Sequence, residues 1–290
     1  MQGFAPALGR RLPSFVRPQN QRSGSAMPEP SLHSLNSRPV RIEPDRQLVV
    51  LARTMQVSST EAETSLKDGV MNYRRFGETC LGQALYRHQS VFQSEAASLS
   101  WSHVELSYFH QIVPIEVSRE LVFNRLLPGL TLLRAEILLT TPSSFLLSHD
   151  WCGSEDHPER KASLEYIRVQ PGHLHQYRNA MRDYCGPAAS KLIESGRFGT
   201  FRAMETTATL FCAPDMTVDW NQIHLCEVNP KNFKGFGAEF AAALQVGAEG
   251  TASIDPFIGL GRIRTIPRWT FNDLVVAEDR AVKAKYETSS

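Results

Sequence analysis

The sequence predicts an α+β fold made of two tandem β-α-β-β-α-β units. The first observation is an echo between residues 101–109 (WSHVELSYF) and residues 220–228 (WNQIHLCEV), which align without a gap and place Glu105 on His224. The second observation is that both stretches alternate apolar and polar residues, as half-buried strands do. The third observation is that strands and helices are expected in the same order in both halves of the chain.

The first unit is predicted over residues 46–142. Its helix after the first strand is indicated by Thr60 and Glu63, which have the spacing of a capping box, and by apolar residues at helical spacing beyond them. A second helix should begin at Pro114 and end before Pro128. The four strands are expected at residues 47–57, 84–93, 100–109 and 131–140.

The second unit is predicted over residues 163–277, after a linker at 143–162. A long helix is expected at 171–195, where Gly186-Pro187 should kink or break it. Another helix should begin at Pro230, since proline is favoured in the first turn. The four strands are expected at residues 164–170, 202–211 and 220–228 and within 261–276.

Both ends of the chain lack this periodicity. Residues 1–45 contain seven prolines among Ser, Asn, Gln and Arg, so they cannot bury enough apolar surface to offset the entropy of ordering, and a disordered leader is expected. Several arginines precede its first acidic residue, Glu29, which leaves an organelle transit peptide over residues 1–26 as one interpretation. A plain leader, or a true start at Met27, is the simpler one. A frayed tail is expected over 278–290.

Composition argues against several classes of function. The chain has 290 residues with 31 basic and 30 acidic side chains, a net charge of +1, so no nucleic-acid partner is predicted. Its most apolar stretch, residues 126–147, contains Arg134 and Glu136, so no membrane span is predicted either. Five widely spaced cysteines without a CxxC pair favour reduced thiols in a cytoplasmic or matrix-like compartment, and cytoplasmic localisation is the prediction.

Two such units in tandem make the ferredoxin-like plait twice. On this order and on the W-x-x-[VI]-[EH]-L echo, residues 46–277 resemble the dimeric α+β barrel superfamily, in the fused form of the NIPSNAP, chlorite dismutase and dye-decolorising peroxidase groups. The resemblance implies two sheets facing each other around a cavity. It also implies a small unsaturated or aromatic substrate that is oxygenated without a tightly held cofactor, or isomerised, cyclised or dehydrated. The alternative is a non-catalytic ligand-binding or adaptor protein of the NIPSNAP type.

No haem site is carried over from this resemblance. The GxxDG motif of the peroxidases is absent, because Lys67-Asp68-Gly69 lacks the first glycine. Residues 149–157 (HDWCGSEDH) mix carboxylates, one thiol and two imidazoles, which match no single metal, so a linker is the preferred interpretation. No cofactor and no metal are therefore predicted, and the chain is expected to be a monomer or a homodimer.

The polar faces of the two echoing strands supply the main catalytic candidates. His224 lies on one of them, and Glu105 and His103 lie on the other, opposite apolar faces that are expected to pack against helices. At matching places on opposing sheets, an imidazole and a carboxylate could act as general acid and base across a cavity. The alternative is a structural histidine and a solvated carboxylate.

Other side chains are expected to bind substrate around the same cavity: Arg168, Arg202, Glu205, His173, Tyr177, Trp220 and His103. Each has a structural alternative, since a buried Arg–Glu pair would equally hold the barrel together and the PGHLHQY stretch would equally form a helix surface. The chain contains no Gly-rich phosphate loop and no HExxH, GxSxG or GxGxxG motif, which argues against nucleotide-dependent and standard hydrolase chemistry.

Overall fold

The computed structural model describes residues 40–41, 47–72, 79–95, 101–110, 118, 122, 128–148, 160–228, 236–247 and 256–278, all within the compact unit Leu35–Ser290. Most of the predicted leader, most of the helix expected from Pro114, the stretch 149–157 and the start of the helix expected at Pro230 fall outside these residues. No helix within the described ranges is long and apolar enough to cross a membrane.

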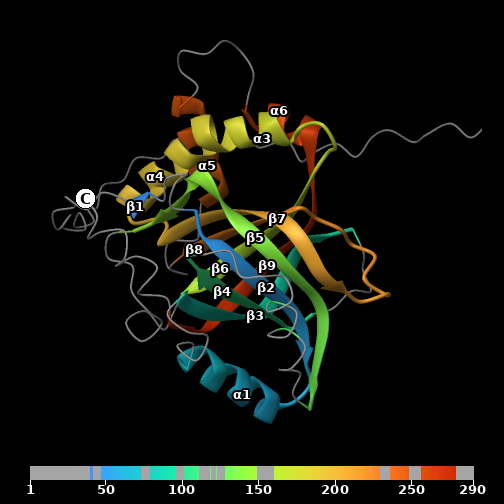
Figure 1. Ribbon diagram of the computed structural model, residues 1–290. Helices are drawn as coiled ribbons and strands as arrows, with labels where there is room; N and C mark the ends of the chain where they lie inside the picture. The colour runs from blue at the N-terminus through green and yellow to red at the C-terminus, as the bar shows by residue number, and fades with distance from the viewer. Residues whose placement is uncertain are drawn as a thin grey trace, which may run out of the picture. The chain divides into compact units, whose positions relative to one another are not determined.

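Eight antiparallel strands close into a barrel in the order β5-β2-β4-β3-β9-β6-β8-β7, with β7 pairing back onto β5 (Figure 1). Within each half the order is fourth, first, third, second, which is the ferredoxin-like order. A further short strand, β1 (Val40–Arg41), pairs with the end of β5 and lies inside the range predicted as leader. The barrel strands are β2 (Val49–Val57), β3 (Cys80–Ser94), β4 (His103–Phe109), β5 (Leu130–Leu147), β6 (Lys161–Val169), β7 (Thr200–Cys212), β8 (Gln222–Val228) and β9 (Arg264–Glu278).

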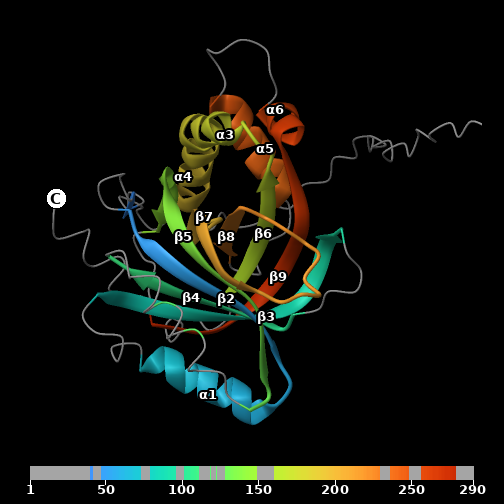
Figure 2. The ribbon, with the colours of Figure 1, turned by 45° about the vertical axis from the view of Figure 1, so that its right-hand side comes forward.

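Helices lie on the outside of the barrel. Figure 2 shows α1 (Thr60–Met71) on one side and α3 (Leu174–Ala180), α4 (Gly186–Glu194), α5 (Phe236–Gly247) and α6 (Pro256–Ile263) gathered on the other. The cap of α1 is Ser59, one residue before the predicted capping box, and its side chain accepts a hydrogen bond from the backbone of Ala62. The two units therefore cover their outer sheet faces with separate helix layers.

The helix expected to kink or break at Gly186-Pro187 continues through a π-helical turn just before that pair. This turn, η3 (Met181–Cys185), joins α3 to α4, and Pro187 sits in the first turn of α4. Proline removes one backbone donor and crowds the carbonyl four residues earlier, and the wider π-helical turn lies where that conflict would fall. The chain keeps its helical direction and places two side chains of the turn over the sheet.

The inside of the barrel is filled with apolar and aromatic side chains from both units and with a few buried charged side chains that contact one another. One buried cluster contains Val104 and Leu106 of β4 together with Ile223 and Leu225 of β8, while separate clusters lie under α1 and under α3–α6. The expectation that these four residues pack against helices, and that the polar faces meet in a central cavity, is wrong. A closed barrel excludes water from its interior, so the more apolar strand faces turn inward and the polar faces turn toward the helices.

The tryptophans of the sequence echo occupy equivalent places at the centre of this interior. Trp101 and Trp220 each lie two residues before the third strand of their unit, and their ring centroids are 5.8 Å apart. Arg268 of β9 lies 3.8 Å from the ring centroid of Trp101, and Arg134 of β5 lies 4.1 Å from that of Trp220. In each case an arginine from the fourth strand of one unit packs on the tryptophan of the other unit. This repetition confirms the tandem repeat.

Candidate functional site

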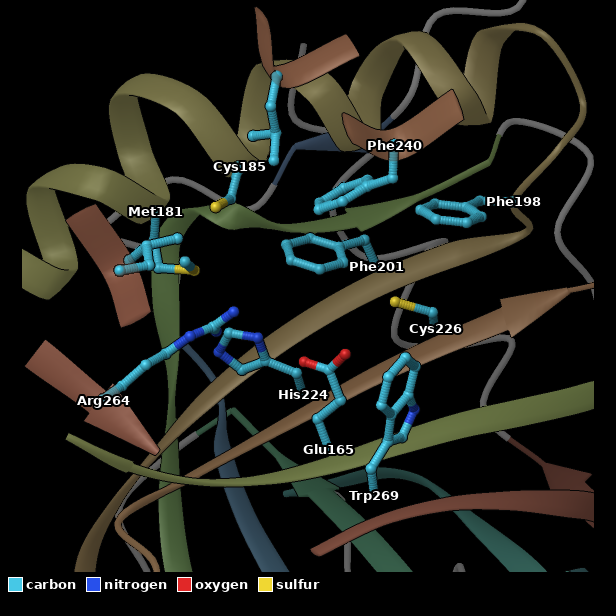
Figure 3. A pocket seen from close by; sticks show the side chains of 12 residues that line it. Glu165, Met181, Cys185, Phe198, Phe201, His224, Cys226, Phe240, Arg264 and Trp269 are labelled. Carbon is cyan, nitrogen blue, oxygen red and sulfur yellow. The ribbon is translucent and has the colours of Figure 1, made fainter. Parts of the chain in front are cut away.

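A cavity of about 270 Å³ lies between the outer face of the second sheet and its helices (Figure 3). Three polar side chains line it, Glu165 of β6, His224 of β8 and Arg264 at the start of β9. The remaining walls are formed by aliphatic, aromatic and sulfur-containing side chains: Met181, Cys185, Phe198, Phe201, Cys226, Phe240, Leu244, Leu260 and Trp269. Its volume is just below the range of about 300–1,000 Å³ that is typical of sites for drug-sized ligands, so it suits a small ligand.

A hydrogen-bonded chain fixes the polar wall. The hydroxyl of Tyr177 lies 3.0 Å from Nε2 of His224, and Nη1 of Arg264 donates to the same hydroxyl at 3.2 Å. Both Tyr177 and His224 are buried. Because the phenol oxygen accepts from Arg264, its own proton is available for Nε2, which would leave the imidazole proton on Nδ1.

The electrostatics of this wall favour a neutral imidazole. Burial, and then the positive charge of Arg264, lower the pKa of His224 to about 3. Burial also raises the pKa of the Cys185 thiol to about 12 and that of Cys226 well above its ordinary value. The histidine therefore has little basicity near neutral pH and the thiols stay protonated.

Glu165 is the remaining titratable group of the cavity. Burial raises the pKa of its carboxyl, and the positive charge of Arg264 opposes that shift. Within the described residues no hydrogen bond reaches this carboxylate, although β6 pairs it directly opposite His224 on β8. A carboxylate in these surroundings is a stronger base than one in water.

The equivalent place in the first unit holds a buried ion pair. There Arg53 of β2 pairs opposite Glu105 of β4, as Glu165 pairs opposite His224, and its Nη2 lies 2.5 Å from Oε2 of Glu105. Gln83 of β3 donates to the same carboxylate at 3.3 Å. The two units thus share a polar strand face, which carries a buried ion pair in the first unit and lines a cavity in the second.

Strand order, barrel closure and the repeated tryptophan contact together decide the fold. The chain has the fold of a fused dimeric α+β barrel. Among solved structures it is similar to an anthrone oxidase-like protein at 11% identity, covering 83% of this chain and 95% of that one, with a TM-score of 0.46. A dye-decolorizing protein from V. cholerae matches at 8% identity, 84% and 98% coverage and a TM-score of 0.43. A mutant chlorite dismutase from Candidatus Nitrospira defluvii matches at 11% identity, 82% and 94% coverage and 0.44. No family model and no curated protein matches the sequence.

Of the residues predicted for the site, the structure brings together only His224 and Tyr177. Glu105 lies under the first unit's helix layer, and His103 lies 3.4 Å from the Glu63 carboxylate of α1. Trp220 and Arg202 are buried, where Trp220 donates to Glu136 at 2.8 Å and Arg202 donates to Tyr108 and Glu227. Nearer the surface, Glu205 pairs with Arg178, Arg168 pairs with Glu95, and His173 contacts Gln176.

Sequence reasoning missed Glu165 and Arg264. Glu165 could have been found, because the ferredoxin-like order places the first and third strands side by side and the alternation of β6 puts Glu165 on the same face as His224. Arg264 carried no such signal, since it lies at the junction of α6 and β9 and the start of that strand was not predicted. Among the described residues no group of three or more His, Cys, Asp or Glu side chains could hold a metal ion.

Proposed function

We propose that this protein is a small-molecule enzyme that removes a proton from an unsaturated or aromatic ligand bound between the second sheet and its helices. The observation that carries the proposal is Glu165, a carboxylate without a hydrogen bond among the described residues, with a raised pKa, facing an apolar cavity. A basic carboxylate in an apolar wall has the properties of a general base.

Each polar side chain has a separate role in this proposal. Glu165 takes a proton from carbon or oxygen of the ligand. The electron pair of the broken bond moves onto a ligand oxygen, which accepts hydrogen bonds from Arg264 and from the Nδ1–H of His224. Tyr177 holds His224 and Arg264 in place. His224 is thus a neutral hydrogen-bond donor, because a pKa of about 3 leaves it a poor base.

This step is common to the reactions that the sequence favours. Isomerisation, cyclisation and dehydration beside a carbonyl group can begin with loss of a proton, and so can oxygenation without a cofactor, which needs a carbanion or phenolate to react with dioxygen. The aromatic walls, with Phe201 at 5.8 Å between centroids from the His224 ring, favour a planar ligand. The steps after removal of the proton depend on the chemistry of the ligand, and they belong to the same proposal.

Proton exchange on a simple carbon acid tests the proposal. The two-ring ketone 2-tetralone should exchange the hydrogens beside its carbonyl with D₂O faster in the presence of the protein, as followed by proton NMR. Glu165→Gln should lower this acceleration by about two to four orders of magnitude, the usual contribution of positioned proton transfer. Glu205→Gln is the matched control, because the Glu205 carboxylate pairs with Arg178 outside the cavity. This variant should accelerate the exchange of 2-tetralone as much as the wild type does.

A non-catalytic ligand-binding protein is the second candidate. The packed interior between the two sheets, where apolar side chains surround buried ion pairs, favours it, because an enzyme that worked between the units would need space there. The two candidates differ in one measurement. Saturable binding of 2-tetralone without accelerated exchange would contradict the enzyme and support the binding protein.

A further inference from the structure

The end of β3, a strand of the first unit, is attached to the β9 segment that carries two cavity residues of the second unit. Gln93 of β3 pairs with Trp269 of β9, and its side chain donates to the carbonyl of Ile266 at 2.7 Å. The backbone N–H of Glu95 donates to the carbonyl of Pro267 at 2.8 Å. The first unit therefore reaches the part of β9 that lies between Arg264 and Trp269.

Phe92 of this same segment packs on the wall of the cavity. Its ring centroid lies 5.2 Å from that of Trp269 and 5.9 Å from that of Phe271, both of β9. Trp269 lines the cavity and donates from Nε1 to the hydroxyl of Ser163 at 2.7 Å. The indole thus contacts both the cavity and Phe92, a residue that is 49% exposed on the surface.

A half-exposed phenylalanine on a strand contributes little burial of its own, and the ring of Phe92 contacts two aromatic residues of β9. The indole of Trp269 has two fixed points, the Ser163 hydroxyl at its nitrogen and the Phe92 ring on its outer side. Removing the second fixed point would let the indole swing outward while the hydrogen bond persists. The cavity would then widen on this side.

We propose that Phe92 is a positioning residue that sets the place of Trp269 and so determines the size of ligand that the second unit accepts. The proposal rests on the cavity being the ligand site of the proposed function. It assigns the first unit a direct part in ligand selection, although every described side chain that lines the cavity belongs to the second unit.

Two aromatic alcohols of different length measure this selection. Fluorescence titration gives the Kd of 2-naphthol, with two rings, and of 2-anthrol, with three. In Phe92→Ala the Kd of 2-naphthol should rise about threefold to tenfold, the value of one aromatic pair. The Kd of 2-anthrol should stay unchanged or fall. Phe92→Tyr keeps the ring and should restore the wild-type ratio, and Val91→Ala, a neighbour that is 43% exposed, should leave it unchanged.

A second readout needs no ligand. Protein grown with 5-fluorotryptophan gives one ¹⁹F signal for each of its four tryptophans, and Trp269→Phe identifies the signal of Trp269. Phe92→Ala should shift or broaden this signal alone, and Phe92→Tyr should not. An unmoved signal together with an unchanged Kd ratio would overturn the proposal. A moved signal in a protein that binds neither alcohol would instead support the positioning role and contradict the proposed function of the cavity.

Discussion

At the scale of single residues, the buried His224 should make the stability of the fold sensitive to acid. Its pKa is about 3 in the folded protein and 6.5 when exposed, so between these values only the unfolded chain binds the proton. The contribution of His224 to the free energy of unfolding should therefore be fully present above pH 6.5. Below pH 6.5 it should fall, by about 1.4 kcal/mol per pH unit at most. Glu165, whose pKa is raised, acts with the opposite sign, because its folded form holds a proton that the unfolded chain loses.

His224→Gln removes the histidine contribution and leaves that of Glu165. Urea unfolding at about pH 7 and about pH 5 should show a drop in the free energy of unfolding for the wild type that is about 2 kcal/mol larger than for the variant. Tyr177→Phe is a useful control, because it removes the hydrogen bond and keeps the buried imidazole. Equal drops in wild type and His224→Gln would show that the imidazole takes up its proton in the folded protein over the same pH range as in the unfolded chain.

Glu105 should matter for stability and not for the reaction. Its side chain and that of Arg53 are both 6% exposed and form an ion pair, so Glu105→Ala leaves a buried guanidinium without its carboxylate. We expect a loss of about 3–5 kcal/mol in the free energy of unfolding, and unchanged 2-tetralone exchange per folded molecule. The double variant Arg53→Met/Glu105→Leu should recover most of the stability. Lost exchange in folded Glu105→Ala would return this residue to the catalytic site that the sequence suggested.

At the scale of elements, the π-helical turn η3 depends on a glycine that follows it. A Cβ at Gly186 would lie 2.2 Å from the backbone carbonyl oxygen of Ser143 in β5, so alanine there must push the helix away from the strand. Gly186→Ala should lower the free energy of unfolding by about 1–3 kcal/mol, as overpacking does. It should also weaken 2-naphthol binding, because Met181 and Cys185 of η3 line the cavity.

Gly261→Ala is the matched control, because a Cβ there meets nothing within 4 Å and the residue lies in α6. Urea unfolding should show that Gly261→Ala leaves the free energy of unfolding unchanged or raises it by up to about 1 kcal/mol, the difference in helix propensity between glycine and alanine. Equal effects of the two substitutions would mean that Gly186 of α4 does not lie close to the Ser143 carbonyl of β5.

The eight barrel strands followed from the sequence, but β1, α6 and the orientation of the strand faces did not. Alternation in β4 and β8 shows which residues share a face, and it correctly grouped Ile223 with Leu225 and separated them from His224. It cannot show which face lies inside a closed barrel, because helices on one side and the opposing sheet on the other bury both. The position of the cavity could not be predicted for the same reason.

At the scale of the whole molecule, the duplication was predictable because both halves keep the same element order and the same tryptophan. What the sequence could not show is that the two halves share one core and have different outer faces. Aligned positions hold an arginine in one unit and a glutamate in the other, Arg53 against Glu165. The strand registers reveal that this exchange gives Glu105 an ion-pair partner in the first unit and places Glu165 opposite His224 in the second.

The shared core predicts that both units unfold together. Trp101 of the first unit packs against Tyr166 and Trp220 of the second, with ring centroids 5.1 and 5.8 Å away. Trp101→Phe removes part of this contact and of the interaction with Arg268, so it should lower the free energy of unfolding by about 1–3 kcal/mol. Hydrogen exchange followed by mass spectrometry should show the same loss of protection in β4 and in β8. Protection lost in β4 and kept in β8 would show that the units unfold separately, and the barrel would then be two domains in contact rather than one cooperative structure.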